Sequence, residues 1–93
     1  MLAELPAITT AGFSFDQPEI RVRAGETVAL RLDNAHSVPH SFDIDELGVH
    51  VEMPAGQSSL ALFKAPPPGT YTYYCQIPRH REHGMEGTLI VEP

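Results

Sequence analysis

Nine prolines and seven glycines are spread along this chain of 93 residues, and their distribution constrains the fold more than any other feature. Proline removes a backbone donor and breaks a helix interior, while glycine weakens helices and strands alike. No stretch of about 12 residues that lacks both shows a clear 3.6-residue apolar repeat. The sequence therefore predicts short strands joined by frequent turns, without long helices.

Seven short segments have the alternation or β-propensity of strands. They are residues 11–15, 19–23, 27–33, 41–44, 59–63, 70–75 and 87–91. In the third, Val28, Leu30 and Leu32 fall on one face and are expected to point inward. Residues 45–53 are ambiguous, and a helical turn is one interpretation. Short strands at this spacing predict an all-β sandwich, and residues 1–93 are long enough for one domain.

The net charge of −6 argues against nucleic-acid binding, which needs clustered Lys and Arg, and is compatible with a basic protein partner. No apolar stretch approaches the roughly 20 residues that span a bilayer. No signal peptide is recognisable near the start. The sequence fits a cytoplasmic protein, and equally a mature domain without its leader or anchor.

The single cysteine, Cys75, excludes an internal disulfide, a Cys₄ zinc site and an iron–sulfur cluster within one chain. A lone cysteine is most often a small buried hydrophobic residue. Here, however, Cys75, His80 and Met85 follow one another as Cys-x₄-His-x₄-Met between two β segments, and one loop can fold them around an ion. His40, after Pro39 at the start of a strand, is the best candidate for a second imidazole. Two nitrogens, a thiolate and a weak axial thioether favour copper over zinc or iron.

Alternatives remain for several of these positions. His83 competes with His80, although its spacing from Cys75 is poorer and it lies only two residues from Met85. Met85 is otherwise a core methionine without a bond to metal. His36 and His50 are expected to be ordinary polar positions, with His36 near the rim of the site.

The pattern resembles the cupredoxins, the type 1 (blue) copper proteins, including the plastocyanin, azurin and rusticyanin-like groups. The likeness rests on residues 23–28, 33–42, 54–57 and 69–75 and on the Cys–His–Met loop followed by Gly87. By this resemblance, the backbone N–H of Ser41 donates to the sulfur of Cys75, and Pro39 offers a distant carbonyl opposite Met85. Many cupredoxins carry asparagine where this chain has Ser41, as rusticyanin-like proteins do. We expect the shorter Ser41 hydroxyl to bond locally.

The resemblance implies a Greek-key sandwich of seven to eight strands and one-electron transfer through one copper ion held by His40, Cys75, His80 and Met85. It also implies a monomer in a periplasmic or other extracytoplasmic compartment, membrane-associated only through a tether outside this chain. Redox proteins such as cytochromes or oxidases are the expected partners. The acidic residues Asp43, Asp45, Glu46 and Glu52 are expected to attract a basic partner, whereas Arg79 and Arg81 put positive charge beside His80.

Rival functions are less well supported by the sequence. A multicopper oxidase has histidines flanking the cysteine, whereas Cys75 lies between Tyr74 and Gln76, so no trinuclear centre is expected and the chain is interpreted as a non-enzyme. A binuclear copper domain needs a second cysteine. A copper chaperone or store remains compatible with the sequence. Tyr74 is expected on the face opposite Cys75, where the likeness to plastocyanin suggests a second electron path.

Overall fold

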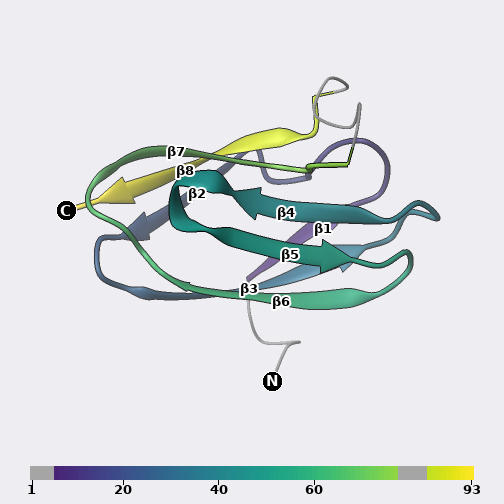
Figure 1. Cartoon of the computed structure of the whole chain (residues 1–93), viewed down its shortest axis with the longest axis horizontal. Helices are drawn as coiled ribbons and strands as arrows, with labels where there is room; N and C mark the ends of the chain where they lie inside the picture. Colours follow the sequence, from purple (N-terminus) through teal and green to yellow (C-terminus); the bar gives the residue numbers. More distant parts are fainter. Residues whose placement is uncertain (1–5, 78–83) are drawn as a thin grey trace.

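Eight strands in two sheets make up this protein, in a computed structural model that describes residues 6–77 and 84–93 (Figure 1). The strands are β1 (Ala7–Thr10), β2 (Glu19–Arg23), β3 (Thr27–Asn34), β4 (His40–Ile44), β5 (Val49–Met53), β6 (Ser58–Lys64), β7 (Gly69–Tyr74) and β8 (Glu86–Glu92). A short 3₁₀ helix, η2 (Asp45–Leu47), joins β4 to β5. The predicted all-β sandwich is therefore confirmed.

The sheets have the orders β1-β3-β6 and β2-β8-β7-β4-β5. The pairs β1–β3 and β2–β8 are parallel, and the other pairs are antiparallel. Alternation along β3 explains how the layers pack, because Val28, Leu30 and Leu32 are buried as predicted. Apolar side chains from both sheets form one core.

The segment before β2 differs from the prediction. Residues 11–15 were expected to form a strand, but the strand lies earlier, at Ala7–Thr10. Phe15 forms an isolated bridge with Thr10, and the backbone N–H of Asp16 donates to the carbonyl of Thr9 at 2.9 Å. The chain thus turns back within residues 11–14, which leaves Phe13 exposed and Phe15 buried.

The ambiguous segment 45–53 contains both a helical turn and a strand. The turn is η2, which ends at Gly48 with a left-handed φ of 64°, a conformation that favours glycine. Strand β5 follows and pairs with β4. It was not predicted because its apolar positions alternate with His50 and Glu52 over only five residues.

The connections β3–β4 and β5–β6, the end of β7 and the start of β8 lie at the same end of the sandwich, on the right in Figure 1. The first leads into His40, and β7 ends one residue before Cys75. The topology therefore brings two distant segments of the chain to one site. Within the described residues, no helix is long and apolar enough to cross a membrane.

Three aromatic side chains pack against one another in the core near this end of the sandwich. The ring of Phe42 stacks on that of Tyr73 with centroids 5.1 Å apart, and Phe15 packs edge-on against Tyr73 at 5.4 Å. The Tyr73 hydroxyl donates to the carbonyl of Gln17. Burial, with smaller contributions from the negative charges of Asp16 and Glu19, raises the pKa of Tyr73 from 10.0 to about 12.

Candidate metal centre

Cys75 and His40 meet at the end of two neighbouring strands. Strand β4 begins at His40, β7 ends just before Cys75, and the two strands pair through Asp43 and Tyr74. Both side chains are buried, and the Cys75 Sγ lies 4.0 Å from the His40 Nδ1. The thiol and the imidazole therefore face one another across a gap that one ion can fill.

Met85 is fixed beside Cys75 through the main chain. The backbone N–H of Cys75 donates to the carbonyl of Met85 at 3.1 Å, and the Met85 side chain is fully buried. Gly84, just before it, has a φ of 90°, which places a tight turn immediately ahead of β8. Three of the four predicted ligands thus come together at one end of the sandwich.

The fourth predicted ligand, His80, lies outside the described residues, as do its competitor His83 and the two flanking arginines, Arg79 and Arg81. Within residues 6–77 and 84–93, no group of three His, Cys, Asp or Glu side chains converges as a metal site. The choice of His80 over His83 therefore stays a prediction.

His36 lies at the rim of the site, as expected, and touches a predicted ligand. Its Nδ1 is 3.0 Å from the Nε2 of His40, and the two rings stack with centroids 5.3 Å apart. Phe13 packs edge-on against both rings. If His40 binds metal through Nδ1, its proton sits on Nε2 and is donated to His36.

Asn34 supports the site in a way that the sequence pattern did not predict. Its buried side-chain amide donates to the carbonyls of Val38 and Met53, at 3.0 and 2.9 Å, and its Oδ1 accepts the backbone N–H of His36 at 2.9 Å. These bonds fold the 34–40 loop that leads into His40. The only indication of this role in the sequence is the position of Asn34, a few residues before His40.

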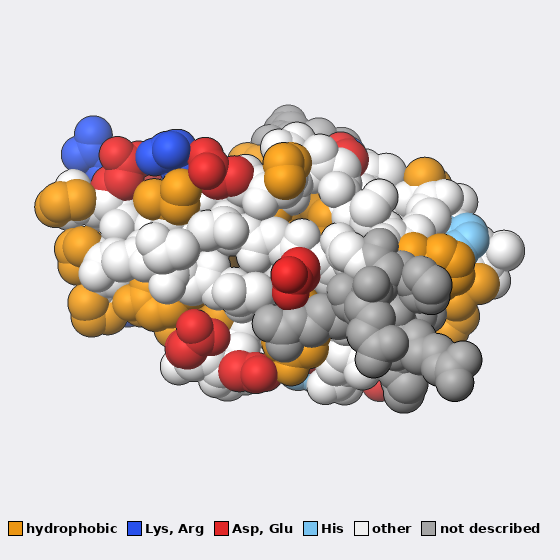
Figure 2. Space-filling model, turned by 90° about the horizontal axis from the view of Figure 1, so that it is seen from above, with side chains coloured by type: hydrophobic (Ala, Val, Ile, Leu, Met, Phe, Trp, Pro, Cys, Tyr) orange, Lys and Arg blue, Asp and Glu red, His pale blue; other side chains and the backbone are white. Residues whose placement is uncertain are grey.

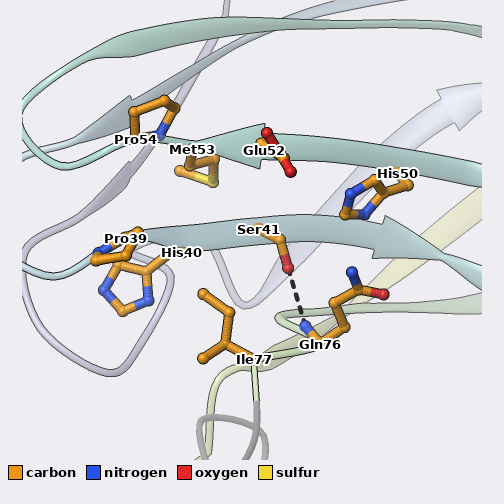
Figure 3. Close-up of a pocket in the computed structure, with 9 residues that line it drawn as sticks. All are labelled: Pro39, His40, Ser41, His50, Glu52, Met53, Pro54, Gln76 and Ile77. Atoms are coloured by element: carbon orange, nitrogen blue, oxygen red, sulfur yellow. Dashed lines mark hydrogen bonds between the residues drawn. The ribbon is translucent and has the colours of Figure 1, made fainter.

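Ser41 bonds locally, as predicted, and also joins the two ligand segments. Its Oγ donates to the Oδ2 of Asp43 at 2.6 Å. The same Oγ accepts the backbone N–H of Gln76 at 2.9 Å (Figure 3). The same oxygen is 3.7 Å from the Cys75 Sγ. The predicted donation from the Ser41 backbone to the sulfur stays a prediction.

Asp43 is not the surface charge that the sequence suggested. Its side chain is only 3% exposed, and its Oδ1 is hydrogen-bonded to the Nδ1 of His50 on β5. His50, expected to be an ordinary polar position, is therefore the partner of a buried carboxylate. Asp43 is removed from the set of exposed acids that attract a partner.

A pocket of about 290 Å³ opens beside these residues. It is lined by Pro39, His40, Ser41, His50, Glu52, Met53, Pro54, Gln76 and Ile77 (Figure 3). Met53 is the cross-strand partner of His40, so β5 forms the wall opposite the 76–77 segment. The pocket connects the surface to the polar face of β4.

The donor chemistry of the described residues fits copper. A thiolate, an imidazole and a nearby thioether are the set that copper takes in trigonal sites with a weak axial ligand. Metal–sulfur and metal–nitrogen bonds of about 2.3 and 2.0 Å at a trigonal angle put the two donors roughly 3.7 Å apart. The observed 4.0 Å between Cys75 and His40 is close to this separation.

The sequence matches the family described as "Cupredoxin-like domain" over residues 6–91. Auracyanin-B of Chloroflexus aurantiacus is 35% identical over 81 residues, which cover 80% of this chain and 34% of that protein. A copper-containing nitrite reductase of Neisseria meningitidis is 36% identical over 85 residues, covering 80% of this chain and 22% of the enzyme. The chain thus spans about a third or less of the length of these relatives.

A solved structure gives the same picture of the fold. Reduced auracyanin from Roseiflexus castenholzii superposes with a TM-score of 0.86, covering 96% of this chain and 97% of that one. The two sequences are 22% identical, so this similarity concerns the fold alone.

Proposed function

Because the chain belongs to the cupredoxin-like domain family, we propose that it binds one copper ion in a type 1 site and carries single electrons between redox proteins. The proposed ligands are His40, Cys75, His80 and Met85. The observation that carries the proposal is the buried approach of the Cys75 Sγ to the His40 Nδ1 at 4.0 Å, with Met85 beside them. A copper ion bound there supplies a one-electron change between Cu(II) and Cu(I).

The protein's own contribution is to hold the donors in place and keep water away. His40 is oriented by His36 at its outer nitrogen, and Cys75 is held by the bond from its N–H to the carbonyl of Met85. Phe42 and Met85 are fully buried and make the surroundings apolar. Donors that stay fixed need little rearrangement when the charge at the site changes by one, which favours fast electron transfer.

An electron carrier is favoured over an enzyme. The residues flanking the cysteine are Tyr74 and Gln76, and neither is the histidine that a trinuclear oxygen-reducing centre requires. The buried side chains of His40, Cys75 and Met85 form a site with one thiolate, which is suited to passing an electron. We therefore propose that this domain has no catalytic activity of its own.

The setting of the protein is proposed from the same family membership. Residues 1–93 would form one monomeric domain in an extracytoplasmic compartment, exchanging electrons with cytochromes or oxidases. Asp45, Glu46 and Glu52 are the remaining acids for attracting a basic partner, since Asp43 is buried. Electron-transfer rates with a basic and an acidic cytochrome, measured against ionic strength, would test this steering.

The first test is the colour of the copper-loaded, oxidised protein. An intense visible band from Cys75-to-copper charge transfer is expected, and Cys75→Ser should abolish it while the metal-free fold survives. His80→Ala should remove or distort the band, whereas the matched variant His83→Ala should leave it nearly intact. A reversed result for the two histidines would move the ligand role to His83, and an intense band in Cys75→Ser would refute the type 1 site.

The second test concerns the axial position. Met85→Leu should raise the reduction potential, because the oxidised state loses more from that ligand than the reduced state does. Met85→Gln should lower it, since an oxygen donor favours Cu(II). Equal potentials in all three proteins would mean that Met85 is not an axial ligand.

A further inference from the structure

A continuous chain of hydrogen bonds runs from the surface to the segment that carries the thiol of the site. It begins at the ring of His50, passes through the carboxylate of Asp43 to the hydroxyl of Ser41, and ends at the backbone N–H of Gln76. The Gln76 N–H also lies 3.3 Å from the Asp43 Oδ2. Since Gln76 directly follows Cys75, the chain ends on the segment that carries the sulfur.

The exposure of the two ionisable groups differs sharply along this chain. The side chain of Asp43 is 3% exposed, whereas that of His50 is 45% exposed and lines the pocket beside the site. A buried carboxylate is costly unless it is paired and hydrogen-bonded. Both oxygens of Asp43 have partners, and the partner that reaches solvent is His50. The net charge of the Asp43–His50 pair can therefore change when His50 exchanges a proton with the solvent.

The direction of the Ser41 hydroxyl depends on Asp43. A serine has one proton to donate, and its Oγ lies 2.6 Å from the carboxylate but 3.7 Å from the Cys75 Sγ. The Ser41 hydroxyl therefore donates its hydrogen bond to the carboxylate, and the Ser41 oxygen accepts a hydrogen bond from the Gln76 N–H. Asp43 thus fixes both the position of the cysteine segment and the polarity that its sulfur faces.

We propose that Asp43 is a positioning residue for the copper site, and that its pairing with His50 makes the reduction potential respond to pH. The proposal rests on the function proposed above. With His50 protonated, the pair is neutral; with His50 neutral, it carries one negative charge close to the thiolate. That charge favours the more positive, oxidised state of the site, so the potential falls as the imidazole loses its proton.

Other ionisable groups lie on the strands and the 3₁₀ helix packed around His50. Asp43 faces it from β4, and Glu52 lies two residues along the same strand, on the same side. Asp45 of η2 accepts the hydroxyl of Tyr74, which pairs with Asp43 across β7 and β4. These charged groups are all carboxylates, and Tyr74 is uncharged near neutral pH. The charge change is therefore assigned to His50.

The test compares the potential of the copper-loaded protein between pH 5 and 9 in four proteins. The wild type should show a potential that falls with pH. His50→Gln should remove the part of the slope that comes from this pair, and Asp43→Asn should remove it and also raise the potential at high pH. Glu52→Gln is the matched control, because it deletes an exposed carboxylate of the same pocket that lies outside the bond chain.

A copper-independent measurement separates this inference from the proposed function. In the metal-free protein, the NMR shift of the Gln76 amide should follow the titration of the His50 ring, and Asp43→Asn should accelerate exchange of that amide. A Gln76 amide indifferent to pH and to Asp43→Asn would overturn the inference even if the protein is blue. So would an unchanged slope in His50→Gln, or equal shifts of potential in Asp43→Asn and Glu52→Gln. His50→Gln changes a half-exposed side chain, so it keeps the test decisive if Asp43→Asn fails to fold.

Discussion

Strands β4 and β2 belong to the same sheet and have five residues each, yet the polar side chains of β4 are buried and those of β2 are exposed. Every residue of β4 is buried, and its outward Ser41 and Asp43 have specific partners. In β2 the outward residues are exposed, and Arg21 pairs with Glu19 at 3.0 Å in the open. The difference separates polar groups that position a site from charges that only face water.

The surface reflects this division. Figure 2 shows positive and negative side chains together at one end of the molecule and a histidine among apolar side chains at the other. Buried polar groups cost stability when a partner is removed, whereas exposed ion pairs contribute about 0–1 kcal/mol. Substitutions along β4 and its neighbours should therefore have much larger effects than substitutions along β2.

The largest effect is expected at Gly87, which lies on β8 directly opposite Tyr73 of β7. A Cβ at this position would overlap the ring of Tyr73, with the Cε1 atom at 2.6 Å, and that ring is held by Phe42 and by its bond to Gln17. Gly87→Ala should cost about 3 kcal/mol or more of unfolding free energy, measured by urea denaturation of the metal-free protein. Gly12→Ala is the control, since a Cβ there meets nothing within 4 Å. Equal losses in the two variants would contradict this account.

The next largest effect is the pH dependence of stability that arises from the buried hydroxyl of Tyr73. Its pKa rises to about 12, mainly through burial, with Asp16 and Glu19 of secondary importance. A raised pKa means that the neutral form is favoured in the folded state. The contribution of neutral Tyr73 to the free energy of unfolding is therefore complete below pH 10. It is lost as the pH rises to 12 and above, by up to about 3 kcal/mol. Denaturation curves between pH 9 and 12 should show this decline, and Tyr73→Phe should flatten it; an equally steep decline in Tyr73→Phe would assign it to other groups.

A smaller difference is expected between one outward residue from each strand. Ser41→Ala removes an acceptor of the Gln76 N–H and a partner of the buried Asp43, and should cost about 1–2 kcal/mol. Arg21→Ala removes only exposed ion pairs and should cost less than about 0.5 kcal/mol. Urea denaturation of both variants measures the contrast. Equal costs would mean that burial of the β4 face does not matter.

The sequence was sufficient where a pattern is local. Alternation identified β3 and the bounds of β2, and the spacing of Cys75 and Met85 indicated residues that the structure brings together at one end of the sandwich. The ligand roles themselves stay predictions, and His80 lies outside the described residues.

The sequence was insufficient where a bond joins distant strands. Ser41 and Gln76 are 35 residues apart, and Asp43 meets His50 only because β4 and β5 pair in one register. That register depends on η2 and on the turn at Gly48, which five alternating residues do not specify. For the same reason Asp43 looked like one more surface acid. Burial of a polar residue is a property of the assembled sheet.

The smallest predicted effect is the coupling between Glu19 and Arg21 on β2. Their side chains are 48% and 56% exposed, so water and salt screen the pair, and ordering two long side chains offsets part of the attraction. A double-mutant cycle with Glu19→Gln and Arg21→Gln should give a coupling below about 0.5 kcal/mol at 0.15 M salt and almost none at 1 M. The matched cycle with Ser41→Ala and Asp43→Asn should give a larger coupling that persists at 1 M salt, because that bond is shielded from solvent. A salt-insensitive coupling on β2 as large as the one on β4 would remove the distinction between the two strands.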